Sequence, residues 1–473
     1  MQFNNSQLKA VKHKTGPMLV IAGPGSGKTT VLTARIRNLI EEYSVNPANI
    51  LVITFTKAAA NEMKSRFNNM MGRSTNVTFG TFHAVFFMIL RAAYNYSVDS
   101  IIKEDVRQNI IKQAIERSRL EPDDLNEMVS NITGEISRVK TEAIDINAYY
   151  SASCPEEEFR DIYKYYVKTL KKMGLIDFDD MLLYCHELLT TRRDILAKWQ
   201  QKYQYILIDE FQDINKIQYD IIKLLAKPQD NLFIVGDDDQ SIYGFRGSKP
   251  EIMLNFDKDY PDTDKVILDT NYRSTGNIVS AAGKVIAHNK VRFAKNINTV
   301  NDPGDKVDII EFNTQAEEYE KIIDNIRKES ASGGNYSDNA VLFRTNSTAA
   351  GFVRKLVEYS VPFVTRDGVP NVFEHWIARD VITYMNIAMG SRKRSDFLQI
   401  INRPKRYIGR DYLADAEISF DNLEKYYEDK NWMIERVDRL KYDIRAMASM
   451  SPYAMINYLR KGVGYDGYLD EYA

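Results

Sequence analysis

The chain has 473 residues, 44% of them hydrophobic, so it can form about three or four compact units with buried cores. Its formal net charge of −2 means that any nucleic-acid site must be a local basic surface. Cys154 and Cys185 give neither a disulfide framework nor a zinc pattern, which favours free thiols in a reducing, cytoplasmic compartment. The N-terminus is polar and no apolar run approaches about 18 residues, so we expect no signal peptide and no membrane partner.

The first predicted elements enclose a phosphate-binding loop. Residues 18–22 predict a buried strand, and residues 29–43 place apolar side chains at helical spacing. The sequence GPGSGKTT lies between them, and its glycines allow backbone amides to turn toward a phosphate. Lys28 can reach the β- and γ-phosphates, and the Thr29 hydroxyl can hold Mg²⁺. We therefore predict an ATP site made by Gly23, Pro24, Gly25, Ser26, Gly27, Lys28, Thr29, Thr30 and Arg35.

A second predicted strand supplies the acidic partner of this loop. Residues 205–208 are apolar and are followed by the sequence DEFQD. A carboxylate at the carboxyl end of a strand in a doubly wound sheet faces the ligand site. Asp209 is suited to hold Mg²⁺, and Glu210 is suited to orient or deprotonate the attacking water. The alternative interpretation is a solvated acidic strand end without a catalytic role.

A third predicted strand, at residues 231–235, leads into a segment of mixed chemistry. Gln240 is a candidate sensor of the γ-phosphate. Single-stranded nucleic acid binds aromatic faces beside arginine, because any base can stack on them. The side chains of this kind that follow are Tyr243, Phe245 and Arg246. Further on, Tyr272 could stack on a base, and Arg273 lies next to it.

In this order the motifs resemble those of superfamily 1 DNA helicases of the UvrD/Rep/PcrA type, over nearly the whole chain. The matching segments are Gln7 and residues 23–30, 53–63, 80–83, 209–213, 235–247, 271–274, 340–346 and 401–409. The resemblance implies that Gln7 and Tyr272 frame the adenine, and that Gln240 and Arg273 reach the γ-phosphate. It gives Lys28, Glu210, Gln240 and Arg273 as catalytic residues, and Thr29 and Asp209 as metal ligands. The implied DNA contacts are Phe55, Thr56, Phe82, His83, Tyr243, Phe245 and Arg246.

The same resemblance implies an α/β fold of P-loop NTPase (RecA-like) parallel-sheet motor domains with helical insertions. We expect a first motor domain at residues 1–95 and 190–275, split by a helical insertion at 96–189. A second motor domain is expected to begin at 276–375, with residues 340–343 as a strand, and a partial helical insertion at 376–473. The basic turn of this last segment, with Arg403, Lys405 and Arg406, is expected to contact a phosphate backbone.

The implied activity is translocation on single-stranded DNA and duplex unwinding, driven by Mg²⁺ and ATP, in DNA repair or replication. The partners would be single-stranded DNA and junctions of single- and double-stranded DNA. Two later segments of the family, with Thr-x-His-x-x-Lys-Gly-Leu-Glu and Tyr-Val-x-x-Thr-Arg, do not occur in the 473 residues. The alternative is therefore a truncated ATP- and DNA-binding module with little or no helicase activity, or one that needs a partner chain or a C-terminal remainder.

Overall fold

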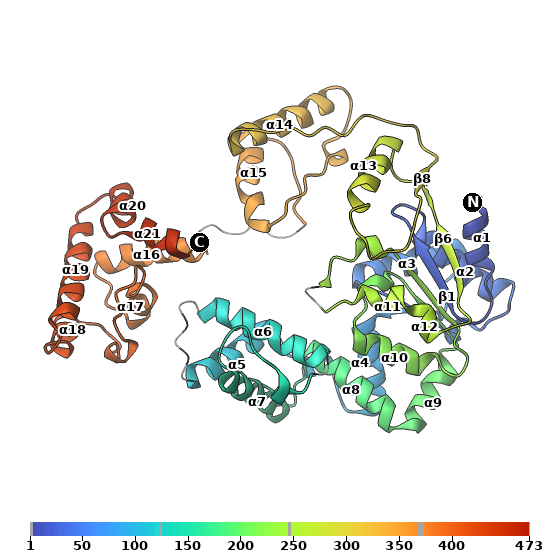
Figure 1. The fold of residues 1–473 in the computed structure, drawn as a ribbon, viewed down its shortest axis with the longest axis horizontal. Coiled ribbons are helices and arrows are strands. Elements are labelled where there is room, and N and C mark those ends of the chain that lie inside the picture. Colours follow the sequence, from blue (N-terminus) through green and yellow to red (C-terminus); the bar gives the residue numbers. More distant parts are fainter. Residues whose placement is uncertain are drawn as a thin grey trace. The chain divides into compact units, whose positions relative to one another are not determined.

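The computed structural model describes residues 3–472 except 119, 121, 123, 124, 143, 245, 246, 367–372 and 374. The chain falls into two compact units, Met1–Asp308 and Ile309–Ala473, which are described separately. Figure 1 shows the elements of each unit. None of the helices among the described residues is both long and apolar enough to cross a membrane.

The first unit is built on a six-stranded sheet in the order β3-β2-β4-β5-β1-β6, in which every neighbouring pair is parallel. The strands are β1 (Met18–Ala22), β2 (Ile50–Thr54), β3 (Thr78–Thr81), β4 (Tyr205–Ile208), β5 (Leu232–Gly236) and β6 (Asp264–Leu268). All residues of β1, β2 and β5 are buried, as expected for central parallel strands covered on both faces. This sheet confirms the predicted α/β fold class.

Helices cover both faces of the sheet, and alternate residues of each strand enter different cores. In β1, Leu19 and Ile21 face one core, whereas Met18, Val20 and Ala22 face the other. The first core is closed by α4 (Phe82–Ala93), α8 (Phe178–Thr191), α9 (Arg193–Lys202), α10 (Lys216–Ala226), α11 (Pro250–Leu254) and α12 (Phe256–Asp259). The second is closed by α1 (Asn5–Lys12), α2 (Lys28–Glu41) and α3 (Lys57–Met71).

A helical insertion interrupts this α/β unit and has a core of its own. It consists of α5 (Glu104–Arg117), α6 (Leu125–Thr141) and α7 (Glu156–Met173), which lie together beside the sheet in Figure 1. The expected insertion continued to residue 189, but Met181 and Cys185 of α8 pack in the core of the sheet. Asp177 caps α8, and its carboxylate also accepts a hydrogen bond of 2.6 Å from the buried Lys140 ammonium. This segment therefore joins the insertion to the α/β unit.

The remainder of the first unit is a short extension beyond β6. It contains β7 (Thr270–Asn271), which pairs in parallel with β8 (Asn298–Thr299), and α13 (Gly276–Ile286) between them. The first compact unit thus extends to Asp308, whereas the sequence suggested a boundary at residue 275.

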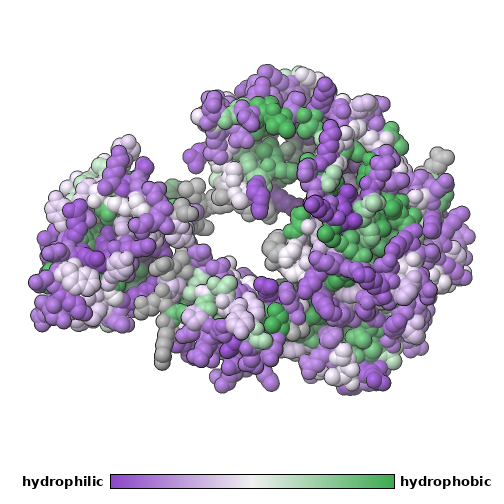
Figure 2. Space-filling view, viewed as in Figure 1, coloured by the Kyte–Doolittle hydropathy of each residue, from purple (hydrophilic) through white to green (hydrophobic). Residues whose placement is uncertain are grey.

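The second unit is helical in the part that the structure describes. Its helices are α14 (Gln315–Ala331), α15 (Asn346–Glu358), α16 (Trp376–Ala388), α17 (Arg394–Ile400), α18 (Phe420–Tyr426), α19 (Asn431–Met447), α20 (Pro452–Lys461) and α21 (Tyr465–Tyr472). The strand expected at residues 340–343 does not form, and Leu342 is 93% exposed. A strand needs a hydrogen-bonded neighbour, and the structure gives this segment none among the described residues. Figure 2 shows the resulting apolar surface over α14 and α15.

The basic turn of the second unit is more buried than expected. Arg406 donates to the backbone carbonyls of Ile400 and Ile401, and its guanidinium is inside the core. Arg403 is paired with the buried carboxylate of Asp380 at 3.0 Å. The prediction that Arg406 contacts a phosphate backbone is therefore wrong for this structure, because its guanidinium is buried and holds the turn together. For Arg403 and Lys405 the contact stays a prediction.

Candidate active site

The glycine loop lies between β1 and α2, at the carboxyl edge of the sheet. Gly25 and Gly27 adopt φ values of 64° and 84°, which side chains disfavour. A Cβ added to Gly25 would lie 2.8 Å from the Cβ of Arg273, so the close approach of that residue requires glycine. Lys28 is the first residue of α2, and the helix N-terminus points its free amides at the loop. The loop can hold an anionic phosphate.

The acidic pair follows β4 and lies next to the loop lysine. Glu210 accepts a hydrogen bond of 2.7 Å from the Lys28 ammonium. Asp209 is only 6% exposed, and burial, with the nearby charge of Glu210, raises its pKa to about 7 in spite of Lys28. A cation beside Asp209 would favour the ionised carboxylate. Asp209 and the Thr29 hydroxyl are both hard oxygen donors, the type that Mg²⁺ prefers, so these residues fit that metal.

A chain of hydrogen bonds connects this acidic pair to Gln240. The Gln212 amide donates to Glu210 at 2.9 Å and accepts from the backbone amide of Asp237 at 3.0 Å. Asp237 in turn accepts a hydrogen bond of 2.6 Å from the side-chain amide of Gln240. Gln212 was not among the predicted site residues, although it lies within the acidic motif. The structure therefore links Lys28 to Gln240 through three intermediate side chains.

Gln7 and Tyr272 lie on the other side of the loop. Gln7 is buried and donates to the Ser26 carbonyl at 3.1 Å, and it also completes the cap of α1 with Asn4. Asn4 donates to the Tyr272 hydroxyl at 3.0 Å, and the Tyr272 backbone amide donates to the Gly25 carbonyl at 2.9 Å. Tyr272 is 43% exposed. It therefore holds the glycine loop through its backbone amide and also presents an aromatic face to solvent.

The turn after β7 lies directly on the loop. Asn271 donates to the Pro24 carbonyl at 2.8 Å and accepts from the backbone amides of Arg273 and Ser274 at 2.7 and 2.8 Å. Arg273 is exposed, and its Cβ lies over Gly25. The structure therefore brings Arg273 to the loop that carries Lys28. Asn271 was not among the predicted site residues, although it begins the Asn-Tyr-Arg-Ser segment.

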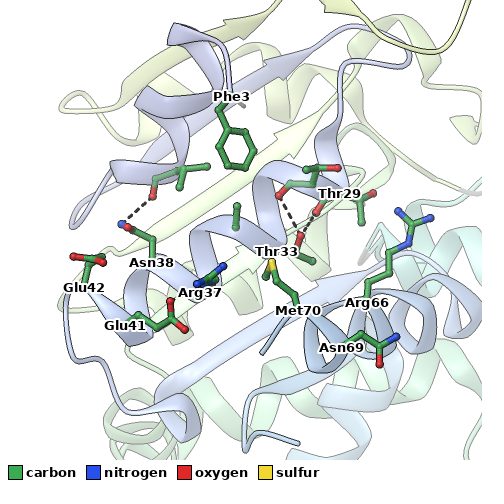
Figure 3. A pocket seen from close by; sticks show the side chains of 13 residues that line it. Phe3, Thr29, Thr33, Arg37, Asn38, Glu41, Glu42, Arg66, Asn69 and Met70 are labelled. Carbon is green, nitrogen blue, oxygen red and sulfur yellow. Dashed lines mark hydrogen bonds and ion pairs between the residues drawn. The ribbon is translucent and has the colours of Figure 1, made fainter. Parts of the chain in front are cut away.

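A groove of about 710 Å³ runs along α2 from the loop. It starts at Thr29 and Thr30, and Phe3, Arg37 and Met70 are among its lining residues. Figure 3 shows Phe3 from the N-terminal segment on one side of α2, and residues of α3 on the other. Space next to the phosphate loop is thus available for the rest of a nucleotide.

Arg35 does not reach this groove. It is 1% exposed, donates to the His13 carbonyl, and its guanidinium lies 4.4 Å from the ring centroid of Phe233. Burial lowers the pKa of Arg35 to about 9. The prediction that Arg35 contacts a nucleotide is wrong for this structure, because the side chain points from α2 into the core beneath the sheet.

The predicted nucleic-acid residues divide into two groups. Phe55 and Tyr243 stack on each other with ring centroids 5.0 Å apart, which brings together residues that follow β2 and β5. Phe82, in contrast, is 4% exposed and packs against Phe86 in the core, so it cannot stack on a base. Phe245 and Arg246 lie outside the described residues.

Two further predicted contacts lie at the N-termini of α3 and α4. Thr56 is exposed, and its hydroxyl caps α3 by accepting from Ala59. The ring of His83 packs edge-on against Phe178, with centroids 5.4 Å apart, and burial lowers the pKa of His83, which favours the neutral imidazole. Phe178 is 53% exposed and was not among the predicted site residues.

A parallel sheet with a glycine loop after β1 and an acidic pair after β4 defines a P-loop nucleoside triphosphatase. Comparison with known families agrees. Residues 3–261 match the UvrD/REP helicase N-terminal domain, and residues 266–435 match the UvrD-like helicase C-terminal domain. The chain belongs to the UvrD/REP helicase family.

Curated relatives are named ATP-dependent DNA helicases or putative ones. The chain is 36% identical to the ATP-dependent DNA helicase PcrA of Staphylococcus epidermidis over 417 residues, which is 86% of this chain and 56% of the relative. It is 33% identical to the putative ATP-dependent DNA helicase YjcD of Bacillus subtilis over 482 residues, which is 99% of this chain and 63% of the relative. The chain therefore spans 56–63% of the length of these relatives.

Proposed function

We propose that this chain binds and hydrolyses Mg²⁺-ATP, and that hydrolysis drives movement on single-stranded DNA and the unwinding of duplexes. The observation that carries the proposal is the contact between Lys28 and Glu210 at the glycine loop. The Lys28 ammonium lies 2.7 Å from the Glu210 carboxylate. A bound γ-phosphate would attract the ammonium, which would leave Glu210 available to the attacking water.

We propose that the parts of the nucleotide occupy three places. The glycine loop at residues 23–30 would hold the phosphates, and Thr29 and Asp209 would hold Mg²⁺. The base and sugar extend toward Gln7 and Tyr272, with the groove of Figure 3 beside them. When bound, Mg²⁺ would offset the charge of the phosphates, and Arg273 and Gln240 would orient the γ-phosphate. DNA-stimulated release of phosphate tests this assignment directly.

We further propose that the α/β unit, α8 included, acts as the first motor domain, and that the second motor domain begins after it in the chain. The helices α5–α7 and the helices from α16 onward would be insertions. Binding of ATP would favour closure of the two motor domains, and hydrolysis would release it. PcrA is named an ATP-dependent DNA helicase and YjcD a putative one, and the shared family supports the same activity for this chain.

Replacing Lys28 with alanine is expected to weaken ATP binding by roughly 10- to 100-fold, because a charge-assisted hydrogen bond contributes about 1.5–3 kcal/mol. Isothermal titration calorimetry with an unhydrolysed ATP analogue measures the change. Lys216→Ala, which removes an exposed lysine paired with Asp220, is the matched control and should bind normally. If the Lys28 variant and the wild type bound the analogue with equal affinity, the assignment of Lys28 to the nucleotide site would be wrong.

Replacing Tyr243 with alanine is expected to lower the affinity for single-stranded DNA about tenfold, since stacking of one base contributes about 1–3 kcal/mol. The loss should be the same for poly-dT and for mixed sequences, because stacking does not read the base. Fluorescence anisotropy with labelled oligonucleotides measures it. Tyr150→Ala, which removes a 76% exposed ring from the helical insertion, is the control. A Tyr243 variant that melts earlier but binds DNA normally would make this ring structural.

A further inference from the structure

The segment of residues 292–298, between α13 and β8, contacts several parts of the candidate active site. Ile297 lies on the glycine loop, because a Cβ added to Gly23 would overlap the Ile297 Cδ1 atom. The backbone amide of Asn298 donates to the Asp269 carbonyl at 2.8 Å, which attaches the segment to the end of β6. This segment, remote in sequence from the first two motifs, is therefore fixed beside the phosphate loop.

The same segment also holds the acidic turn that follows β5. Arg292 donates two hydrogen bonds of 2.6 Å to the two carboxylate oxygens of Asp239. The backbone amide of Phe293 donates to the Asp238 carboxylate at 2.8 Å. A two-point contact between a guanidinium and a carboxylate fixes orientation as well as distance. The 292–298 segment thus determines where this turn lies.

Lys295 is the centre of the contact. Its Nζ atom lies 2.6 Å from Asp237 Oδ1, 2.6 Å from Asp238 Oδ1 and 2.8 Å from Asp239 Oδ2. The side chains of Lys295 and Asp237 are both 0% exposed. A buried ion pair requires close geometry to offset the loss of hydration, so these distances indicate a fixed arrangement.

The three carboxylates could otherwise suggest a metal site, since ligand atoms of all three lie within 4.8 Å of one another. The ammonium of Lys295 already lies within hydrogen-bond distance of each one and supplies the compensating charge. Burial disfavours that charge, but the surrounding carboxylates outweigh burial and raise the pKa of Lys295 above its ordinary value. Lys295, which contacts all three carboxylates, and Arg292, which contacts Asp239, are therefore cations of this cluster.

Asp237 connects this cluster to the candidate catalytic residues. One carboxylate oxygen accepts from Lys295, and the other accepts a hydrogen bond of 2.6 Å from the side-chain amide of Gln240. Its backbone amide donates to Gln212, which also donates to Glu210. Without the ammonium, three carboxylates would repel one another, and Asp237 would either turn away or take up a proton. The first change would release the Gln240 amide, and the second would weaken its hydrogen bond to Asp237.

We propose that Lys295 is a positioning residue, which fixes Gln240 for contact with the γ-phosphate by holding Asp237 in place. The proposal rests on the proposed function, in which Gln240 faces the terminal phosphate of ATP. Lys295 touches neither the nucleotide loop nor the acidic pair, so its effect passes through the Asp237 carboxylate. It extends the active site to a segment that lies more than fifty residues after the turn that it controls.

The test compares Lys295→Met with Lys295→Arg, which keeps the charge, and with Lys295→Met/Asp238→Asn, which removes one repelling carboxylate. Lys265→Met, which breaks the exposed pair with Asp257, is the matched control. Hydrogen exchange is measured first, without nucleotide, on the complete chain. We expect faster exchange at residues 237–241 in Lys295→Met, unchanged exchange in β1 and β2, and partial recovery in Lys295→Arg. Unchanged exchange at residues 237–241 would overturn the proposal.

Kinetics then separate positioning from a general loss of structure. Lys295→Met should lower kcat for ATP hydrolysis about 10²-fold, the effect of a misplaced reacting group, with little change in KM. Adding Gln240→Ala should lower kcat little further, since both changes remove the same contact. If the two effects multiply, Lys295 does not act through Gln240 and the proposal is wrong.

These measurements also separate the inference from the proposed function. A wild-type chain without phosphate release would contradict the proposed hydrolysis, but hydrogen exchange would still decide whether Lys295 holds the turn. If the single variant Lys295→Met fails to fold, the same exchange and kinetic measurements are made on the double variant Lys295→Met/Asp238→Asn. Faster exchange throughout the sheet in both methionine variants would show a structural role and overturn positioning.

Discussion

Replacing Glu210 with glutamine is expected to lower the rate of ATP hydrolysis by about 10²- to 10⁴-fold and to leave ATP bound. The carboxylate now accepts from Lys28 at 2.7 Å and from Gln212, and it lies one residue after Asp209. Glutamine keeps the size and can still face Lys28, but it cannot accept the proton of the attacking water. Phosphate release under saturating ATP and DNA measures the loss.

ATP binding must be measured as well as the rate of hydrolysis. Binding tests the contacts to the metal and the phosphates, whereas the rate tests the activation of water. Asp209 is unchanged in the variant, so the metal and the phosphates should bind as before. Removing the charge of Glu210 should also lower the raised pKa of Asp209, since that charge contributes to the shift. Glu187→Gln, an exposed change on α8, is the matched control. Hydrolysis at the wild-type rate in Glu210→Gln would show that another group activates water.

Local patterns were sufficient to predict the motor core. Residues 18–22 and 205–208 are short apolar runs that end at a glycine loop and at an acidic pair, and both became buried parallel strands. Such strands can be predicted from their run of apolar residues and from the residues that follow it. Each strand must bury both of its faces, and its last residues lie at the edge of the sheet where the ligand binds. Lys28 and Glu210 thus came together from positions 182 residues apart.

Side-chain direction could not be predicted in the same way. Phe82 follows a motif threonine but begins α4, where its ring turns into the core beside Phe86. Arg35 lies one turn beyond the loop and enters the interior through a contact with the Phe233 ring. A helix directs successive side chains about 100° apart, so closeness in sequence to a motif does not decide which face a residue occupies.

Contacts between residues far apart in the sequence could not be predicted either. Lys295 has no motif around it, and only the fold brings it to the three carboxylates of residues 237–239. The family resemblance implied a strand at 340–343, but strand formation depends on a neighbouring strand that the segment itself does not specify. In the structure residues 340–343 form no strand, and Leu342 is exposed.

Replacing Arg273 with alanine is expected to lower ATP hydrolysis by about 10³-fold or more, because an arginine that stabilises charge on the transferred phosphoryl group accounts for roughly 10³–10⁵ in NTPases. Asn271 fixes the backbone of Arg273, and the Cβ of Arg273 lies over Gly25. The Arg273 side chain therefore begins beside the phosphate loop. Single-turnover phosphate release from prebound ATP measures the chemical step without the contribution of binding.

Comparing the affinities for ADP and for an unhydrolysed ATP analogue shows whether Arg273 acts at the γ-phosphate. ADP affinity should stay near the wild-type value, whereas affinity for an unhydrolysed ATP analogue should fall, because only the latter carries the third phosphate. Arg273→Lys should recover part of the rate, since an ammonium keeps the charge but loses the planar two-point contact. Arg193→Ala, at the exposed start of α9, is the control. Equal losses for ADP and the ATP analogue would instead place Arg273 at the inner phosphates, where Lys28 and the loop amides already bind.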